Sequence, residues 1–151
     1  MPYMRGGRRL VRKDGYSLSY RDIQAKRGSR RGTRFDDRVA IGGYPVDIHP
    51  IEGCNYIPKG SAKVAPYYIP YRAMHSDVIT NLLVAGKALA QDYVVSSSTR
   101  VHSTEFATGS SAGAIAALLY QENWSTMDGA GEIEALQEAV KPYSPIEWNI
   151  K

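Results

Sequence analysis

The stretch SSSTRVHSTEFATGSSAGAIAALL, residues 96–119, decides how the rest of the chain is interpreted. Its second part belongs to a run of small and apolar residues over positions 104–120 that has helical character. Only Glu105 is charged in this run, so the predicted helix has no face suited to water. We therefore expect it to be buried in its own domain or beneath a partner. Gly109 and Gly113 share one face, which favours either close helix packing or a groove for a flat ligand.

The start of this predicted helix has the features of a binding site. The first backbone N–H groups of a helix lack intrahelical acceptors and carry partial positive charge, so Ser103 and Thr104 suit an anion or an electron-rich carbonyl. Arg100 precedes them and adds a full charge. This combination fits the N1–C2=O edge of a flavin, which gains negative charge on reduction. The helix dipole disfavours charged His102, so we expect a neutral, hydrogen-bonding histidine there.

Length and composition indicate one soluble globular domain, or part of a larger one. The chain has 151 residues, of which 43% are hydrophobic and 23% charged. No apolar run approaches the roughly 18 residues that a membrane span requires. Cys54 is the single cysteine, and no cluster of Cys and His has the spacing of a metal site. These features favour a reducing intracellular compartment, mitochondrial or cytoplasmic.

The net charge of +4 is unevenly distributed. Residues 1–38 contain 12 Lys and Arg against 4 Asp and Glu, giving +8, whereas the remainder contains 7 against 11, giving −4. A basic first quarter is compatible with nucleic-acid contact, a mitochondrial address, docking on an acidic neighbour or a solvated surface. Nucleic acid is disfavoured, because no recognition module is present and aromatic residues are sparse. Asp14 and Asp22 interrupt the pattern of a targeting peptide.

Local patterns predict a mixed α/β organisation. A short helix is expected within residues 16–28, because Ser19 and Asp22 have nearly the spacing of a capping box and Gly28 suits a helix end. The other expected elements are extended segments over residues 38–49 and 64–74 and an amphipathic helix near residues 131–140.

Residues 82–85, LLVA, form a short apolar run typical of a strand that is buried on both faces. Gly86 follows directly and would place a tight turn at the carboxyl edge of that strand. Open α/β sheets bind their ligands at this edge. The run therefore predicts a second part of the binding site.

Other candidate residues have two interpretations each. Asp47 and His49 fall on one face of a predicted strand, as an acid/base pair or around a structural histidine. Arg72, three residues before His75, could clamp a substrate carboxylate or anchor a loop. The chain has no nucleophile elbow, P-loop or zinc signature, which excludes conventional hydrolases and kinases.

Six segments, in this order, resemble the C-terminal part of the FAD-dependent oxidoreductase family, flavoproteins with a glutathione-reductase-like FAD fold. They are PYMRGGRRLV, YRDI, GGYPVDIH, YYIPYRAM, NLLVAGKAL and TRVHSTEFATGSSAGAIAALL. The resemblance covers roughly residues 2–120 and rests on several motifs in register. It implies an α/β fold, an α+β fragment that forms the C-terminal portion of a Rossmann-like flavoprotein with part of its substrate or cap sheet.

The resemblance also implies a division of the chain and a set of site residues. Residues 1–80 would be a β-rich cap or substrate segment, 81–122 the last strand and buried helix of the FAD domain, and 123–151 a C-terminal helix and tail. The residues expected to bind the cofactor are Gly86, Lys87, Arg100, Val101, His102, Ser103, Thr104 and Gly109. Those expected to serve catalysis are His49, Arg72 and Arg100, and no metal is implied.

The chain departs from the family pattern in its dinucleotide-binding half. That half begins with a strand and a G-x-G-x-x-G turn, and this sequence has no such pattern. Gly6 and Lys87 stand where the family has glutamate and arginine, and His102-Ser103 stands where it often has Met-Pro.

We therefore expect a chain that binds FAD weakly alone and works with a partner chain supplying the ADP-binding half, in hydride transfer from a small organic substrate. The alternatives are a non-catalytic subunit of a larger, for instance mitochondrial, assembly that keeps the fold without FAD, and a truncated product.

Overall fold

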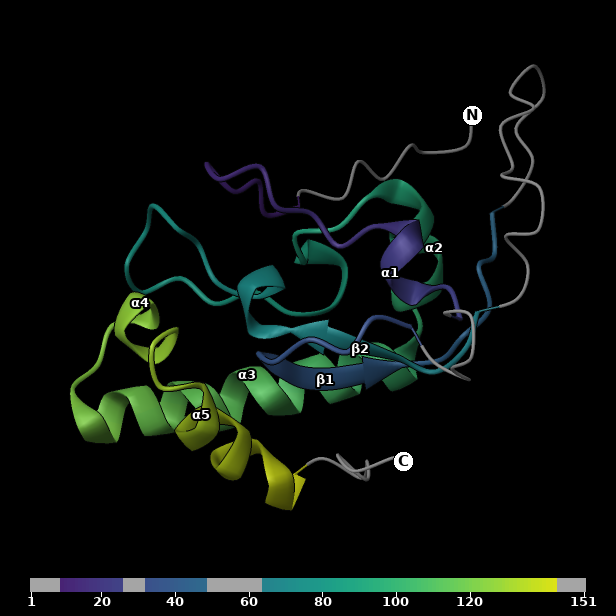
Figure 1. Ribbon diagram of the computed structural model, residues 1–151. Coiled ribbons are helices and arrows are strands. Elements are labelled where there is room, and N and C mark those ends of the chain that lie inside the picture. Colours follow the sequence, from purple (N-terminus) through teal and green to yellow (C-terminus); the bar gives the residue numbers. More distant parts are fainter. Residues whose placement is uncertain (1–8, 26–31, 49–63, 144–151) are drawn as a thin grey trace, which may run out of the picture.

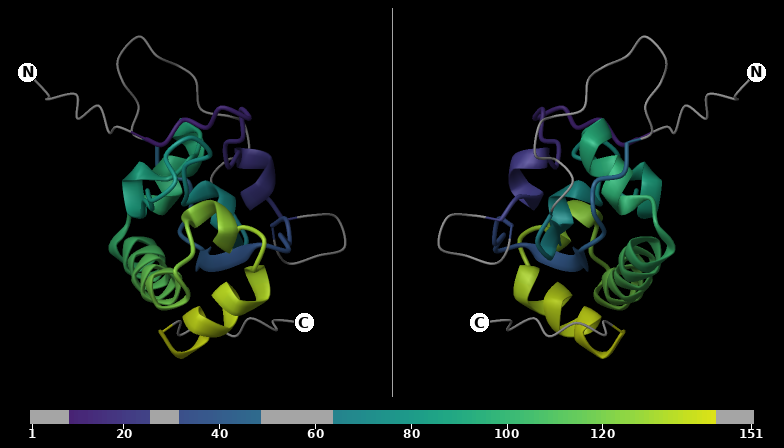
Figure 2. Two further views of the ribbon diagram at one scale, coloured as in Figure 1. Left: turned by 90° about the vertical axis from the view of Figure 1, so that its left-hand side faces the viewer. Right: turned by 90° about the vertical axis from the view of Figure 1, so that its right-hand side faces the viewer.

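The computed structural model describes residues 9–25, 32–48 and 64–143 of the chain (Figure 1). Its helices and strands are α1 (Tyr20–Ile23), β1 (Arg38–Gly42), β2 (Tyr67–Pro70), α2 (Tyr93–Thr99), α3 (His102–Glu122), α4 (Thr126–Gly129) and α5 (Ile133–Val140). Three turns of 3-10 helix lie at Tyr71–Ala73, Gly86–Ala88 and Lys141–Tyr143. The long helix α3 runs beneath the two strands and contacts β1 and α5. Figure 2 views α3 along its axis, with α1 and α2 above it and α5 below.

The predicted helix over residues 104–120 is confirmed as α3, which extends two residues further at each end. It ends at Asn123, whose left-handed backbone (φ 54°) stops the helix. Only one face of α3 is buried within the described part of the chain, by Thr104, Ala107, Thr108, Ser111, Ile115 and Leu119. Phe106 and Tyr120 on other faces are 68% and 88% exposed. The described residues therefore do not bury the helix all round, and the expectation that a partner covers its other faces stays a prediction.

The two strands form an antiparallel pair in which Gly42 lies opposite Tyr67. The Tyr67 ring crosses Gly42 so closely that a Cβ on this glycine would lie 2.4 Å from the ring. The buried Tyr67 hydroxyl is 2.7 Å from Ser98 Oγ in α2. Glycine in β1 thus makes room for the side chain that connects β2 to α2.

Sequence patterns with local signals are confirmed. Ser19 and Asp22 form the expected capping box of α1, and Gly28 lies outside the described residues. The amphipathic pattern near residues 131–140 corresponds to α5, which buries Leu136 and Val140.

The predicted strand over residues 82–85 is wrong. These four residues are half-buried and lie in a connecting segment, with a single bridge between Leu83 and His75. The Val84 N–H donates to the carbonyl of Met74 at 2.7 Å, so the segment pairs with a turn and not with a sheet. The apolar residues of this segment belong to a loop, and Leu83 packs against the core.

The buried apolar side chains form one cluster, to which all three predicted segments of the chain contribute, from Leu18 through Ile115 to Val140. The division into cap, FAD-domain and tail segments stays a prediction. Within the described ranges, no helix has both the length and the apolar character to cross a bilayer.

Replacing Tyr67 with phenylalanine should lower the free energy of unfolding by about 1–2 kcal/mol, because one buried hydrogen bond is lost and Ser98 loses a partner. Urea denaturation of the purified chain measures this change. The matched control is Tyr120→Phe, which removes a hydroxyl from a side chain that is 88% exposed and should change stability by less than about 0.5 kcal/mol. Equal effects of the two substitutions would contradict the assigned role of Tyr67.

Candidate functional site

The first turn of α3 carries exposed residues and no side-chain cap from the described residues. Helix α2 ends at Thr99, and only Arg100 and Val101 separate it from α3. Val101 is the N-cap residue and offers no side-chain acceptor to the first backbone N–H groups. His102 and Ser103 in the first turn are exposed. Of the residues expected to offer amides to a ligand, Ser103 is exposed, whereas Thr104 is buried and its N–H donates to the carbonyl of Val101 at 3.1 Å.

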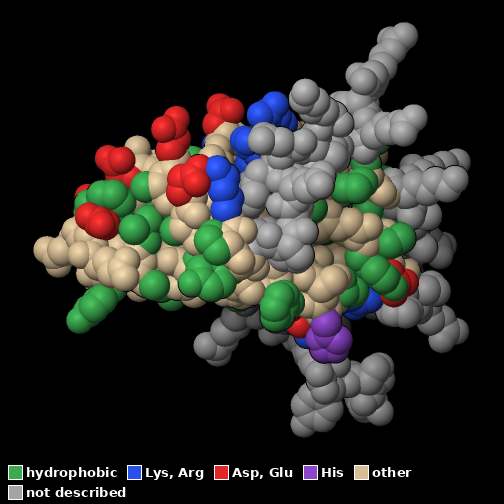
Figure 3. Space-filling model, turned by 90° about the horizontal axis from the view of Figure 1, so that it is seen from below, with side chains coloured by type: hydrophobic (Ala, Val, Ile, Leu, Met, Phe, Trp, Pro, Cys, Tyr) green, Lys and Arg blue, Asp and Glu red, His purple; other side chains and the backbone are tan. Residues whose placement is uncertain are grey.

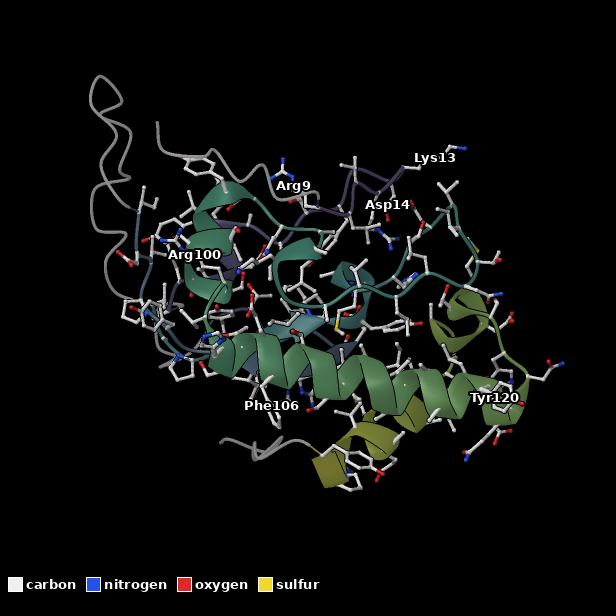
Figure 4. The ribbon with its side chains drawn as sticks, turned by 180° about the vertical axis from the view of Figure 1, so that it is seen from behind. Arg9, Lys13, Asp14, Arg100, Phe106 and Tyr120 are labelled. Atoms are coloured by element: carbon white, nitrogen blue, oxygen red, sulfur yellow. The ribbon has the colours of Figure 1, made fainter. Side chains whose placement is uncertain are left out.

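Arg100 stands beside this helix start and is fixed by the segment that follows β1. Its Nη2 donates to the backbone carbonyl of Asp47 at 2.8 Å and lies 3.8 Å from the Asp47 carboxylate. The Arg100 side chain remains 41% exposed, so its charge still faces solvent. Figure 4 shows Arg100 near the end of α3 that carries Phe106, with Tyr120 at the other end.

Gly86 and Lys87 lie against the first turns of α3. The N–H of Gly86 donates to Thr108 Oγ1 at 3.0 Å, and Thr108 in turn donates to the carbonyl of Thr104. Gly86 has a left-handed backbone (φ 58°) that favours glycine. Lys87 Nζ lies 3.4 Å from Glu105 Oε1 and its side chain is 60% exposed. The segment with Gly86 and Lys87 and the first turns of α3, which are separate in the sequence, thus meet in the fold.

The remaining residues expected at the cofactor are placed on the open side of α3. The His102 side chain is fully exposed, and its Nδ1 lies 3.7 Å from Glu105 Oε2. A Cβ built on Gly109 would meet no atom within 4 Å. The neutral role expected for His102 and the cofactor contact expected for Gly109 stay predictions.

Arg72 belongs to a different part of the molecule. Its Nε and Nη2 donate to the two carboxylate oxygens of Asp37 at 2.8 and 2.6 Å. It lines a cavity of about 430 Å³ together with Arg12, Asp14 and His75. Figure 4 shows Asp14 far from Arg100. The structure thus does not bring Arg72 to the start of α3, and its bidentate pairing fits the loop-anchoring interpretation.

His49 lies outside the described residues, so the proposed pair with Asp47 stays a prediction. Among the described residues, no group of three His, Cys, Asp or Glu side chains is arranged to hold a metal ion.

The cavity around Arg72 contains an ion-pair network that the sequence did not reveal. Arg12 is bonded to Asp14, with Nη2 to Oδ2 at 2.7 Å, and donates to the carbonyls of Arg72 and His75. The hydrogen bond from Arg12 lowers the pKa of Asp14 to about 2. Both guanidinium groups are therefore neutralised by carboxylates of the chain itself. The only signal in the sequence was the Asp14 that interrupts a basic stretch, and its distant contacts are set by tertiary structure.

His75 is buried in this network and is neutral in the folded chain. Its Nδ1 lies 3.0 Å from the carbonyl of Ser76, so Nδ1 carries the proton, and Nε2 faces Arg12 Nη1 at 3.4 Å. Its ring stacks on Tyr71 with a centroid distance of 4.5 Å. Burial lowers the pKa of His75, because a charged ring would lose its hydration beside a guanidinium.

Comparison with known proteins identifies one family. The model of the FAD dependent oxidoreductase family matches residues 1–140. This match confirms the FAD-dependent oxidoreductase family inferred from the six sequence segments, whereas the glutathione-reductase-like fold and the assignment to the C-terminal part of the family stay predictions. Searches of curated proteins and of solved structures gave no match.

Substituting alanine for Gly86 should lower the free energy of unfolding by about 1–2 kcal/mol, because alanine is strained at positive φ. A Cβ there would also lie 3.2 Å from Glu105 Cγ. The control is Gly15→Ala, which has a similar φ of 75° but no atom within 4 Å of its Cβ. Thermal unfolding of Gly86→Ala with and without Glu105→Ala isolates the crowding. Additive effects of Gly86→Ala and Glu105→Ala on stability would show that a side chain at position 86 does not crowd Glu105 in α3.

Acidification from about pH 7 to pH 5 should reduce stability through His75. The unfolded histidine titrates near 6.5 and the folded one at lower pH, so the unfolded state binds more protons in this window. Stability is fully present above the unfolded pKa and is lost as the pH falls below it. Denaturation of His75→Gln should show a flatter pH dependence than that of the parent. The contribution of Asp14, whose pKa is also lowered, is lost only below about pH 4.

Proposed function

The chain belongs to the FAD dependent oxidoreductase family, and we propose that it supplies the part of a flavoprotein that faces the isoalloxazine ring. In this proposal the fold is the C-terminal portion of a Rossmann-like, glutathione-reductase-like flavoprotein. The dinucleotide-binding half comes from a partner polypeptide. The observation that carries the proposal is the convergence of Arg100, Gly86 and Lys87 on the open N-terminus of α3.

The donor groups at this helix end fit the electron-rich edge of a flavin ring. The uncapped amides of His102 and Ser103 present backbone N–H groups, and Arg100 adds a partly exposed charge. The described residues do not provide a cradle for the pyrophosphate, and the sequence has no G-x-G-x-x-G pattern. The site thus fits the ring end of FAD and lacks the groups for its ADP end. We expect weak binding of FAD to this chain alone.

When bound, FAD would accept a hydride from a small organic substrate. The residues of this chain act electrostatically: the α3 amides and Arg100 stabilise negative charge at the ring edge. Lys87, exposed beside Glu105, is proposed to face the ribityl and phosphate region, and its exposed charge supports this role. The substrate-orienting roles of Arg72 and His49 stay predictions, and for Arg72 this role competes with its ion pair to Asp37.

The partner half is proposed to cover the exposed side of α3. Phe106 is 68% exposed, and Gly109 and Gly113 have no atom within 4 Å of a built Cβ. A helix side of this kind permits close approach of another backbone. Association with a partner would then remove from water the apolar surface that the chain itself leaves open.

The alternative function is a non-catalytic subunit that keeps the family fold without FAD. The contacts of Arg100 with Asp47 favour it, since they stabilise the arginine without a ligand. The absent glycine pattern favours it as well. The two functions differ in one property, which is whether the complex of this chain with its partner binds a flavin.

The proposal predicts that the purified complex shows visible flavin absorbance and loses it when this chain is removed. Arg100→Ala should make the flavin midpoint potential more negative by roughly 20–40 mV, about 1–2 kcal/mol for a two-electron couple. Arg100→Lys should retain part of the effect. Arg34→Ala, which removes an exposed charge elsewhere, is the control and should leave the potential unchanged. A colourless complex would favour the structural subunit, and an unchanged potential would remove Arg100 from the flavin site.

A further inference from the structure

Apolar side chains are exposed at the C-terminal end of α3, far from Arg100. Val78 and Ile79 are 63% and 58% exposed, Tyr120 is 88% exposed and Met127 in α4 is 38% exposed. Figure 4 shows Tyr120 at the opposite end of α3 from Arg100. Because α3 has 21 residues, its ends are separated by about 30 Å. The proposed flavin site therefore does not account for this exposed group.

These side chains form one surface and not scattered positions. The backbone N–H and the Oγ1 of Thr126 both donate to the carbonyl of Thr80, at 2.8 and 2.6 Å, and so hold the loop with Val78 and Ile79 against α4. A cavity of about 540 Å³ lies between this loop and α3, and Asn81, Leu83, Tyr120 and Trp124 are among its lining residues. Its volume is in the range of pockets that accept a side chain or a small ligand.

The residues that line this cavity are uncharged, and acidic residues dominate the part of the chain that follows α3. Residues 121–143 contain five acidic residues, Glu122, Asp128, Glu132, Glu134 and Glu138, and a single basic one, Lys141. Lys141 pairs with Glu138. Glu122 is exposed and forms no ion pair within the described part of the chain. Figure 3 shows acidic side chains gathered at the end of the molecule that carries α4.

The described part of the N-terminal segment contacts Asp77 and forms no ion pair with Glu122 or Asp128. Asp77, next to Val78, accepts from the backbone N–H groups of Lys13 and Asp14 at 3.0 and 2.9 Å. Arg12 Nη2 also lies 4.0 Å from the Asp77 carboxylate, whereas Glu122 and Asp128 form no ion pair with another described residue. Asp128 accepts from the backbone N–H of Ser125 in its own turn at 2.8 Å and remains exposed.

We propose that this surface, formed by the cavity beside Tyr120 and by the exposed residues Val78, Ile79, Glu122, Met127 and Asp128 of the adjoining segments, binds a basic amphipathic segment of a partner protein. An apolar side chain of the segment enters the cavity beside Tyr120 and Trp124. Lysine or arginine side chains of the segment pair with Glu122 and Asp128. The combination of an apolar pocket and an acidic rim selects this chemistry over an acidic or purely polar partner. The inference stands independently of flavin binding.

The test uses the full chain and a fluorescein-labelled helical peptide composed of leucine and lysine, with the leucine and glutamate version as its counterpart. We expect fluorescence anisotropy to show saturable binding of the lysine peptide and no binding of the glutamate peptide. Tyr120→Ala and Glu122→Lys should each weaken binding by about tenfold or more. Two matched controls should bind as the parent does: Tyr143→Ala, which removes another exposed aromatic ring, and Asp36→Lys, with the same charge change at an exposed position.

Circular dichroism of each variant separates loss of binding from loss of fold. A peptide that does not bind, or that binds equally to parent and Tyr120→Ala with both folded, would overturn the proposal. Equal binding of the lysine and glutamate peptides would overturn the charge selection. Sedimentation that shows a dimer of this chain, abolished by Tyr120→Ala, would assign the surface to a second copy and overturn the proposed partner.

Discussion

The hydrogen bond between Tyr67 and Ser98 determines where the N-terminus of α3 lies. Ser98 Oγ donates to the carbonyl of Tyr44, so its hydrogen is used there and the Tyr67 hydroxyl is the donor to Ser98. Burial raises the pKa of Tyr67 to about 12, which keeps this hydroxyl protonated at any physiological pH. Ser98 is two residues before Arg100. The strand pair thus fixes the short connection from which both the arginine and the open helix end project.

Buried hydroxyls extend this principle along α3. Ser111 Oγ donates to the carbonyl of Val39 in β1 at 2.6 Å, and Thr108 Oγ1 accepts from Gly86. Each side chain also donates or is close to a carbonyl one turn earlier, so the helix remains hydrogen-bonded. A buried backbone group without a partner costs about 1–3 kcal/mol. The hydroxyl-rich composition of this stretch is therefore explained in large part by attachment of the helix to irregular backbone, and the ligand-binding potential lies in the amides and Arg100.

The sequence predicted the features that depend on near neighbours. The capping box of Ser19 and Asp22 and the extent of α3 follow from residues within a few positions of each other. Residues 82–85 show the limit, because an apolar run of four has the same composition in a buried strand and in a packed loop, and only the pairing partner decides. The links from Arg12 to His75 and from Arg72 to Asp37 span tens of residues and left no periodic signal. For the candidate site, the helix start and Arg100 were identified, whereas the meeting of Gly86 with Thr108 required the fold.

The one-sided burial of α3 connects the two surfaces inferred for this chain. The exposed charges at the two ends of α3 are separated by about three Debye lengths at physiological salt. Salt therefore screens the electrostatic interaction between the two ends. The open N-terminus with Arg100 and the acidic surface around Tyr120 can therefore bind different groups without electrostatic interference. Both ends nevertheless depend on the same packing contacts, which hold α3 against β1 and α5. Loosening those contacts would disturb both surfaces together, whereas a change confined to one end would leave the other intact.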